Sequence, residues 1–376
     1  MPADVKRKGE LVEGFRILDE LGQGAASVIY VVHDPKNKHV WALKHVVKTN
    51  PKDQRFLDQA EQEYSIASKL DHPALRKIER VIRKKESLLG GTSELYLVME
   101  LVDGISCQDR PPTTFEDAVW IFEQTANGLD YMHGEGFVHA DMKPNNIIAV
   151  LNDDGQPEVK IIDLGQSCKI GTVKERIQGT PEYIAPEQVH RRAITPKTDV
   201  YNLGAAMYWI LTRQFVPSAL GTEDSLISSI DDSMIPRAKP VQELNPKIPD
   251  KLAELIMQCI QIDPEARPTM GQVADRLNMI RARLLADATT RKNGKRTIDG
   301  NGTRVPDGPG GSKSGSRGLS DSKNPAGSNG PSNGSTNGST PPKVKNVPPP
   351  PIDPGPGLAD ADDGGHSHPP DHSGKK

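Results

Sequence analysis

Two short segments near the middle of the chain carry acidic, basic and amide side chains at a spacing that suits phosphoryl transfer. The first segment holds Asp141, Lys143 and Asn146, and the second holds Asp163. An aspartate can orient an attacking hydroxyl and accept its proton, while a neighbouring lysine offsets charge on the transferring phosphoryl group. Asparagine and aspartate also supply the oxygen ligands that Mg²⁺ prefers. Any one of these residues could be structural, but the ordered set predicts a phosphoryl-transfer site.

A lysine and a glutamate in the first part of the chain could form a second charged centre. Lys44 ends an apolar, strand-like run, and an unpaired buried ammonium is costly, so Lys44 should reach solvent or meet an acid. Glu63 lies on a predicted helix together with Ile66 and Leu70 and could be that acid. The spacing of the two residues by itself favours an exposed surface pair.

A glycine-rich turn between two strand-like runs could lie over a nucleotide. Glycine lets the backbone approach phosphate oxygens closely, with amide N–H groups facing them. The third glycine of a G-x-G-x-x-G pattern is replaced by Ser27, and a hairpin turn is the commoner explanation for such a segment taken alone. The residues of the turn are Leu21, Gly22, Gln23, Gly24, Ala25, Ala26, Ser27, Val28 and Ile29.

The elements that must position these residues fall into two groups. The N-terminal part contains one helical pattern at residues 53–70, which His72-Pro73 ends, and it otherwise alternates in the strand manner. Its five strand-like runs are residues 15–18, 28–32, 39–47, 75–82 and 95–102. After residue 104 the pattern is mainly helical, at residues 115–133, 199–212, 250–262 and 270–286. These patterns predict an α+β fold with a small five-stranded β lobe carrying one helix and a larger, mostly α lobe.

The C-terminal region differs in composition from the rest of the chain. From about residue 290 it contains no Phe, Trp or Tyr, so it cannot bury enough apolar area to offset its ordering entropy. We therefore predict an N-terminal extension at residues 1–14, a folded domain at 15–286 and a disordered low-complexity tail at 287–376. Pro348 to Pro351 could bind weakly to a proline-binding module, although a flexible spacer is the simpler interpretation.

Charge and cysteine content narrow the class of protein. The formal net charge of −3 gives no indication of a nucleic-acid partner. Three scattered cysteines are too few for a disulfide framework and fit a reducing compartment. No apolar run approaches the roughly 20 residues of a membrane span, and residues 1–10 lack the apolar core of a signal peptide. The sequence thus predicts a cytoplasmic protein with no membrane span and no nucleic-acid partner.

Together the motifs resemble those of eukaryotic-type Ser/Thr protein kinases, and of bacterial members in particular. The motifs follow the family's order, beginning with the glycine turn, Ala42-Leu43-Lys44, His139-x-Asp141-x-Lys143-x-x-Asn146 and Asp163-Leu164-Gly165. They continue with Gly179-Thr180-Pro181-Glu182, Ala185-Pro186-Glu187, Asp199 and Arg267-Pro268. The resemblance covers about Phe15 to Ala286 and implies the two-lobed protein-kinase fold.

The resemblance implies ATP and Mg²⁺ as cofactors and assigns the nucleotide contacts to the small lobe. Residues 21–29 would cover ATP. Lys44, paired with Glu63, would contact the α- and β-phosphates. The segment from Glu100 to Val102 would be the hinge whose backbone meets the adenine.

The resemblance also assigns roles in the large lobe. Asp141 would be the catalytic base with Lys143 beside it, and Asn146 and Asp163 would bind Mg²⁺. The residues with an architectural role would be Asp199, Glu187 and Arg267. Because Lys143 and the segment that begins at Gly179 resemble Ser/Thr kinases, the implied substrates are proteins bearing Ser or Thr.

Three alternative functions remain open on the sequence alone. The first is a catalytically inactive kinase-fold scaffold, although Lys44, Asp141, Asn146 and Asp163 are all present. The second is a small-molecule phosphotransferase, although such enzymes usually lack the segment that ends in Glu187. The third is an interaction protein that works through its tail, for which the tail has no specific motif.

The chain departs from the family pattern at Ser27, Leu164 and Ala140. Ala140 stands where the family commonly has an arginine that meets a phosphate on the activation loop. We therefore hypothesise that activity does not depend on such a phosphate. In the segment from Gln166 to Gln178, which corresponds to that loop, Ser167 and Thr172 could still be phosphorylated.

Overall fold

A computed structural model describes residues 6–24, 26–85, 91–152, 155–218, 220 and 231–298, with the backbone alone for 291–298. The chain divides into two compact units, Met1–Arg304 and Val305–Lys376. The whole second unit lies outside the described residues, as do Ala25 and the proline run from Pro348 to Pro351. The predictions made for the tail beyond residue 298 therefore stay predictions.

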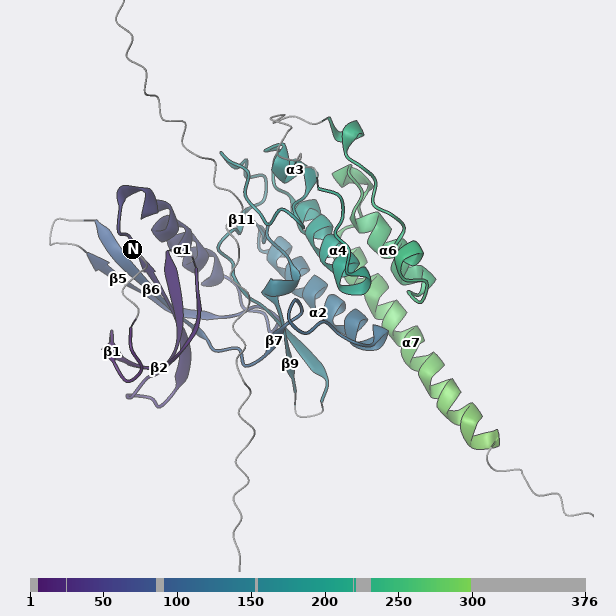
Figure 1. The fold of residues 1–376 in the computed structure, drawn as a ribbon, viewed down its shortest axis with the longest axis horizontal. Helices are drawn as coiled ribbons and strands as arrows, with labels where there is room; N and C mark the ends of the chain where they lie inside the picture. Colours follow the sequence, from purple (N-terminus) through teal and green to yellow (C-terminus); the bar gives the residue numbers. More distant parts are fainter. Residues whose placement is uncertain are drawn as a thin grey trace, which may run out of the picture. The chain divides into compact units, whose positions relative to one another are not determined.

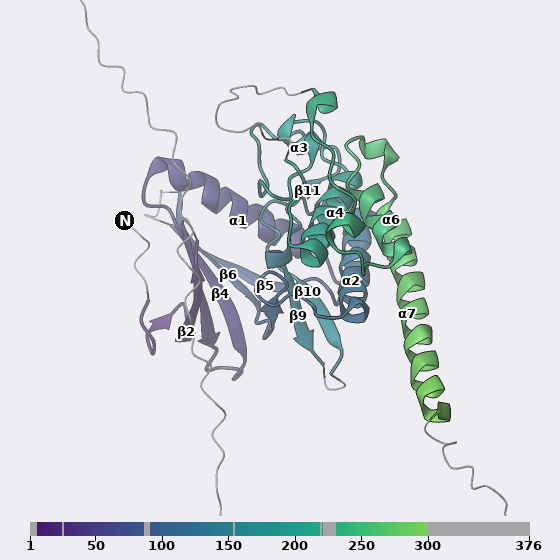
Figure 2. The same ribbon diagram turned by 45° about the vertical axis from the view of Figure 1, so that its right-hand side comes forward.

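The N-terminal part of the first unit is an antiparallel sheet with one helix (Figure 1). Its six strands follow the order β1-β2-β3-β4-β6-β5. Their bounds are Leu11–Val12 (β1), Phe15–Gln23 (β2), Ser27–His33 (β3), Val40–Val47 (β4), Ile78–Lys85 (β5) and Thr92–Glu100 (β6). The helix α1 (Gln54–Ala67) contacts β4, β5 and β6 (Figure 2). The pattern missed β1, a two-residue strand in the predicted N-terminal extension that pairs with the start of β2.

The larger lobe is built around helices, with short strands at its junction with the small lobe (Figure 1). Its helices are α2 (Phe115–Gly134), α3 (Pro186–Val189), α4 (Pro196–Thr212), α5 (Val241–Leu244), α6 (Asp250–Cys259) and α7 (Met270–Ile298). Its strands are β7 (Ile105–Ser106), β8 (Phe137–Val138), β9 (Ile147–Leu151), β10 (Pro157–Ile161) and β11 (Cys168–Lys169). Single 3₁₀ turns occupy Pro144–Asn146, Asp232–Met234 and Pro264–Ala266, and a further one, Pro51–Asp53, precedes α1 in the small lobe.

Helix α7 is longer than its sequence pattern predicts. Its apolar spacing weakens after Ala286, yet the helix continues to Ile298. The added stretch contains helix-favouring Ala, Arg and Lys but also Gly294, Asn293 and three Thr, so helix propensity alone does not explain the extension. The first part of the predicted tail is therefore helical, while the predicted two-lobed fold class is confirmed.

The two faces of the small-lobe sheet are buried in different clusters, which decides where Lys44 lies. Leu43 packs with Tyr30 in one cluster, while Ala42 and Val46 belong to the cluster that includes residues of α1. Because side chains alternate along a strand, Lys44 lies on the face of Ala42 and Val46. The sequence of β4 thus turns the ammonium of Lys44 toward α1.

Backbone and side-chain hydrogen bonds join the two lobes close to the predicted site. The N–H of Ile161, at the end of β10, donates to the carbonyl of Ala74 (2.7 Å), and the N–H of Arg76 donates to the carbonyl of Ile161 (3.0 Å). On α1, Gln62 Nε2 donates to the carbonyl of Ser167 (2.6 Å). These bonds fix the segment that holds Asp163 against α1 and the small lobe.

The membrane prediction can be examined on the described helices. None of them is both long and apolar enough to cross a bilayer. The longest, α7, carries charged residues along its whole length, which accounts for this result.

Candidate active site

We use the term catalytic loop for residues 139–146, which hold the predicted base Asp141. This loop is anchored by the buried carboxylate of Asp199 on α4. The backbone N–H groups of His139 (2.8 Å) and Ala140 (2.7 Å) donate to it, and His133 Nε2 lies 2.9 Å from the same carboxylate. Burial opposes its charge, but His133 and the loop amides outweigh burial and lower the pKa of Asp199 below its ordinary value. Ala140 has a φ of +61°, so its bond to Asp199 holds a conformation that alanine rarely adopts.

Asp141, the predicted base, lies in a small network with Lys143 and Thr180. Its Oδ1 accepts from the N–H (2.9 Å) and the Oγ1 (2.8 Å) of Thr180, and its Oδ2 accepts from Lys143 Nζ (2.9 Å). Lys143 Nζ also donates to Thr180 Oγ1 (2.7 Å). Asn146 Nδ2 donates to the backbone carbonyl of Asp141 (2.9 Å). Three of the predicted residues therefore meet as expected, and a fourth group, Thr180, joins them.

The predicted pairing of Lys44 with Glu63 is present in the structure. Lys44 Nζ lies 2.6 Å from Glu63 Oε2, and Arg76 Nη2 lies 3.8 Å from Glu63 Oε1. Burial opposes the charge of Lys44, but Glu63 and Asp163 outweigh it and raise the pKa of Lys44 above its ordinary value. The ammonium is therefore charged at neutral pH and makes one hydrogen bond with its three N–H groups.

Asp163 lies beside this charged centre. Burial would raise the pKa of its carboxyl, but Lys44 and Arg76 outweigh burial and hold that pKa below its ordinary value. Its φ is +66°, and Gly165 N–H donates to its Oδ1 (3.2 Å). A Cβ at Gly165 would lie 2.8 Å from Gln59 Nε2 on α1, so glycine permits the close approach there.

Asp163 and Asn146, the predicted metal ligands, carry oxygen atoms of the kind that Mg²⁺ prefers. Asp163 is ionised, and Asn146 uses its amide nitrogen on the catalytic loop, which leaves its amide oxygen as a ligand. In the described part of the chain, no three His, Cys, Asp or Glu side chains are grouped to hold a metal. Mg²⁺ needs few protein ligands, however, because phosphate oxygens and water complete its shell.

In the described part of the glycine turn, the side chains of neighbouring residues face opposite sides of the sheet. Gly24 N–H donates to the carbonyl of Ser27 (2.7 Å), which closes the turn, and Ala25 lies outside the described residues. Ile29 packs against the cluster on the α1 face, whereas Val28 is buried in the other cluster. The side chain of Val28 therefore faces away from Lys44 and could contribute to a nucleotide site through its backbone.

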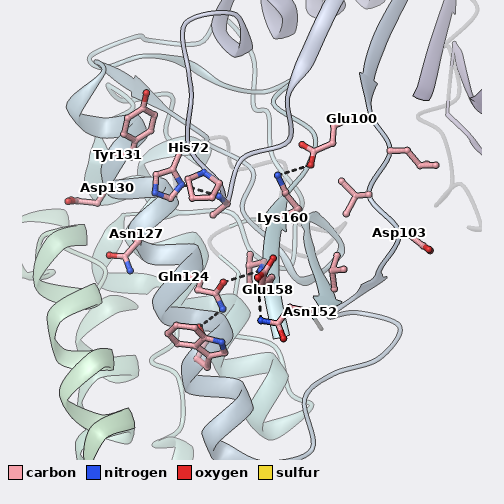
Figure 3. Close-up of a pocket in the computed structure, with 17 residues that line it drawn as sticks. His72, Glu100, Asp103, Gln124, Asn127, Asp130, Tyr131, Asn152, Glu158 and Lys160 are labelled. Carbon is pink, nitrogen blue, oxygen red and sulfur yellow. Dashed lines mark hydrogen bonds and ion pairs between the residues drawn. The ribbon is translucent and has the colours of Figure 1, made fainter. Parts of the chain in front are cut away.

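The hinge segment also presents its side chains away from the predicted nucleotide site. Glu100 Oε1 pairs with Lys160 Nζ (2.7 Å) (Figure 3). Its Oε2 accepts from Lys77 N–H (3.1 Å). Glu100 and Val102 line a cavity of about 860 Å³ together with residues of α2, β9 and β10. Lys44, Asp141 and Asp163 do not line this cavity. The predicted adenine contact thus rests on the hinge backbone.

Glu187 and Arg267, predicted as architectural, form a buried bidentate ion pair. The two N–O distances are 2.7 and 3.0 Å. The guanidinium also donates to three backbone carbonyls, and its carbon lies 4.9 Å from the ring centre of Tyr201. This pair joins the short helix α3 to the loop between α6 and α7.

Three polar residues of the site were not singled out from the sequence. Thr180 contacts both Asp141 and Lys143, although it was quoted only within a motif that indicates substrate class. Gln188, on α3, donates to the carbonyl of Ala140 (2.8 Å). Arg76 approaches Glu63 from the strand-like run at residues 75–82, where no motif marks it as a site residue. Thr180 lies within one motif and Gln188 directly follows another, so the motifs were a signal for both positions.

The two residues suggested for phosphorylation differ in accessibility. Ser167 has no exposed surface, and its hydroxyl lies 3.4 Å from the carbonyl of His139. Thr172 is half-buried, and its hydroxyl donates to the carbonyl of Lys169 (2.7 Å). In this conformation a kinase could not reach Ser167, because the residue packs beneath the catalytic loop.

Comparison with known proteins agrees with this geometry. The family model described as protein kinase domain matches residues 15–277. Serine/threonine-protein kinase DCLK2 of Rattus norvegicus is 30% identical over 269 residues, which are 70% of this chain and 33% of that protein. A probable serine/threonine-protein kinase of Clostridium acetobutylicum is 28% identical over 285 residues, which are 73% of this chain and 41% of that protein.

A third relative, myosin light chain kinase A of Dictyostelium discoideum, is 30% identical over 208 residues, or 54% of this chain and 68% of that protein. The chain therefore spans less than half the length of the rat and clostridial relatives. The match to the family model, however, covers most of the chain and contains every predicted site residue. This chain belongs to the protein kinase domain family.

Proposed function

We propose that this chain is a Ser/Thr protein kinase that transfers the γ-phosphoryl group of ATP to a protein hydroxyl. The observation that carries the proposal is the contact of Asp141 with both Lys143 and Thr180, next to the charged centre of Lys44 and Asp163. These groups supply a base, two cations and metal ligands on adjoining segments. Phosphoryl transfer needs such positioned charge more than covalent chemistry.

Asp141 can act as the base because its carboxylate retains acceptor capacity. A carboxylate offers about four lone-pair sites. Donors from Thr180 and Lys143 occupy three of these sites on Asp141. The remaining site can accept the hydrogen bond of a substrate hydroxyl and then its proton. Lys143 has one N–H group left over for an oxygen of the transferring group.

The nucleotide would be held by Lys44 and by the backbone of residues 21–29. Lys44 has two N–H groups left for phosphate oxygens, and Glu63 holds the ammonium in place. Asn146 and Asp163 would hold Mg²⁺, which offsets the charge that develops on the phosphates. The residues of the chain thus orient ATP from two sides.

A protein substrate is favoured over a small molecule by the segment that holds Thr180. Glu187 and Arg267 fix this segment, and the relatives named above are protein kinases by name. An inactive scaffold is less well supported, because Asp141 and Asp163 keep carboxylate oxygens that a substrate and a metal could use. The tail-based interaction function has no support in the described residues.

The proposal is tested with Asp141→Asn and with transfer of labelled phosphate from ATP to a generic basic protein. Transfer should fall about 10²- to 10⁴-fold, because an amide cannot accept the hydroxyl proton. Asp58→Asn, which changes an exposed carboxylate on α1, is the matched control and should transfer at the wild-type rate. Phosphoamino-acid analysis should find phosphoserine or phosphothreonine.

Two outcomes would contradict the proposal. Equal transfer by wild type and Asp141→Asn would remove Asp141 from the reaction. Transfer by wild type to small hydroxylated compounds but to no protein would favour the small-molecule phosphotransferase.

A further inference from the structure

Gln188 is a buried amide whose hydrogen bonds are all made within the protein. It lies on α3 and is 4% exposed. Its Nε2 donates to the carbonyls of Ala140 (2.8 Å) and Gln178 (3.2 Å). Its Oε1 accepts from Ala185 N–H and Asn202 Nδ2, both at 3.0 Å. Two donors and two acceptor sites are the full capacity of a side-chain amide.

This network fixes the orientation of the amide. If the nitrogen and oxygen of Gln188 were exchanged, the oxygen would face two carbonyl oxygens and the nitrogen would face two N–H donors. Asn202 in turn donates to the carbonyl of Tyr183 (2.7 Å) and so holds the acceptor end of the network. The donor end of Gln188 therefore faces Ala140 and Gln178.

The two carbonyls that Gln188 binds belong to the two segments that meet at the proposed base, Asp141. Ala140 directly precedes Asp141, and Gln178 lies two residues before Thr180, which donates twice to Asp141. Gln188 thus closes a ring that runs through the catalytic loop and the segment before Thr180. Gly179, within this ring, has a φ of +131°, and a Cβ there would lie 3.1 Å from Gln188 Nε2.

The backbone of Ala140 depends on these hydrogen bonds, because the methyl side chain of alanine can make none. Its methyl group is buried with Val138, Cys168 and Ile194. Its φ of +61° is costly for alanine and persists only where the surroundings hold it. Asp199 binds its N–H and Gln188 binds its carbonyl, so both backbone polar groups of the residue before the base are fixed.

We propose that Gln188 is a positioning residue that sets the geometry between Asp141 and Thr180 by bridging the two loops. This inference rests on the proposed kinase function. Gln188 does not reach the reacting atoms and acts through the backbone on either side of them. Without it, the carbonyls of Ala140 and Gln178 would lose this donor, and the strained Ala140 would lose one of its two restraints.

The test is Gln188→Glu, which keeps the length and the acceptor atoms but loses both donors when it is ionised. At pH 8, kcat should fall about 10- to 100-fold, because a small displacement of the base is enough for such a loss. The KM for ATP should stay within about twofold of wild type, since Lys44 and the glycine turn are unchanged. Burial against two carbonyl oxygens should raise the pKa of the new carboxyl. On going from pH 8 to pH 6 the group should therefore gain a proton and one O–H donor, so the ratio of variant to wild-type kcat should rise.

The matched control is Gln124→Glu on α2. Gln124 Nε2 donates to the carbonyl of Pro157 (2.9 Å) and its Oε1 accepts from Val159 N–H (3.2 Å), so it also bridges backbone groups (Figure 3). It contacts neither loop of the ring. Gln124→Glu should lower the unfolding midpoint but leave kcat within about twofold of wild type at both pH values.

Each outcome of this experiment either supports or overturns the proposed positioning role of Gln188. An unchanged kcat for Gln188→Glu, a loss equal to that of Gln124→Glu, or a ratio that does not respond to pH would overturn the proposal. So would a variant that binds no ATP at either pH, because a positioning role requires a folded nucleotide-binding protein. If wild type itself transfers no phosphate, the proposed function fails first, and this inference fails with it.

Discussion

Two buried glutamates of this protein, Glu63 and Glu187, each pair with a cation, and yet they differ in what the pair can do. Glu63 has no exposed surface and lies 2.6 Å from Lys44, while Glu187 is 2% exposed and lies 2.7 Å from Arg267. In burial and distance the pairs are nearly the same. The difference lies in the hydrogen bonds that surround them.

Arg267 uses all five of its N–H groups within the protein, on the two oxygens of Glu187 and on the carbonyls of Lys197, Gln261 and Ile262. Lys44 uses one N–H of three, and Glu63 Oε1 has no hydrogen-bond partner among the described residues. A pair with every group satisfied can serve only as structure. A pair with spare donors beside the predicted nucleotide site can bind an anionic ligand.

The largest expected effect breaks the saturated pair. Arg267→Ala leaves Glu187 buried without a cation and removes the guanidinium's bonds to three carbonyls, so the free energy of unfolding should fall by about 3–5 kcal/mol. Chemical denaturation of the variant and of wild type measures the difference. The control is Arg83→Ala, which removes an exposed bidentate pair with Glu61 and should cost at most about 1 kcal/mol. Similar losses for the two variants would mean that burial does not separate these pairs.

The second expected effect breaks the pair with spare donors. Lys44→Met should lower phosphate transfer about 10²- to 10³-fold, because a positioned cation near the phosphates is lost. The free energy of unfolding should fall less than in Arg267→Ala, since Arg76 still faces Glu63. Transfer assays and denaturation on the same preparation measure both quantities.

Lys48→Met is the matched control for this change. Lys48 lies just after β4, and its ammonium donates to Gln54 Oε1 (2.9 Å), away from Glu63. It should keep wild-type transfer. A stability loss in Lys44→Met as large as that in Arg267→Ala, with transfer retained, would reverse the assignment of the two pairs.

The fold and most of the charged site could be predicted because their signals are local. The alternation around Lys44 places it on the face of α1, and the order of Asp141, Lys143, Asn146 and Asp163 places them on adjoining loops. The structure brings these residues together as the sequence predicts. Their roles in catalysis stay predictions.

The contacts that could not be predicted join segments that are distant in the chain. Gln188 reaches Ala140 across 48 residues, and Thr180 reaches Asp141 across 39 residues. No periodicity records such contacts, because they depend on the packing of α3 and α4 against the catalytic loop. The side-chain directions of Val28 and Glu100 could not be predicted for a related reason, because a motif names residues and not their faces.

The smallest expected effect concerns the segment between Asp163 and Thr180, which the protein's own groups already hold. Lys174 Nζ donates to the carbonyl of Gln166 (2.5 Å), and Gln188 holds Gln178. Because these bonds hold the segment without a phosphate, phosphatase treatment and Thr172→Ala should each change kcat/KM by less than about twofold. Mass spectrometry establishes the phosphate content before each assay. The prediction is contradicted if phosphatase treatment and Thr172→Ala both cause a large loss of kcat/KM and rephosphorylation restores only the wild type. The segment would then need a bound phosphate, as the spare donors of Lys44 do.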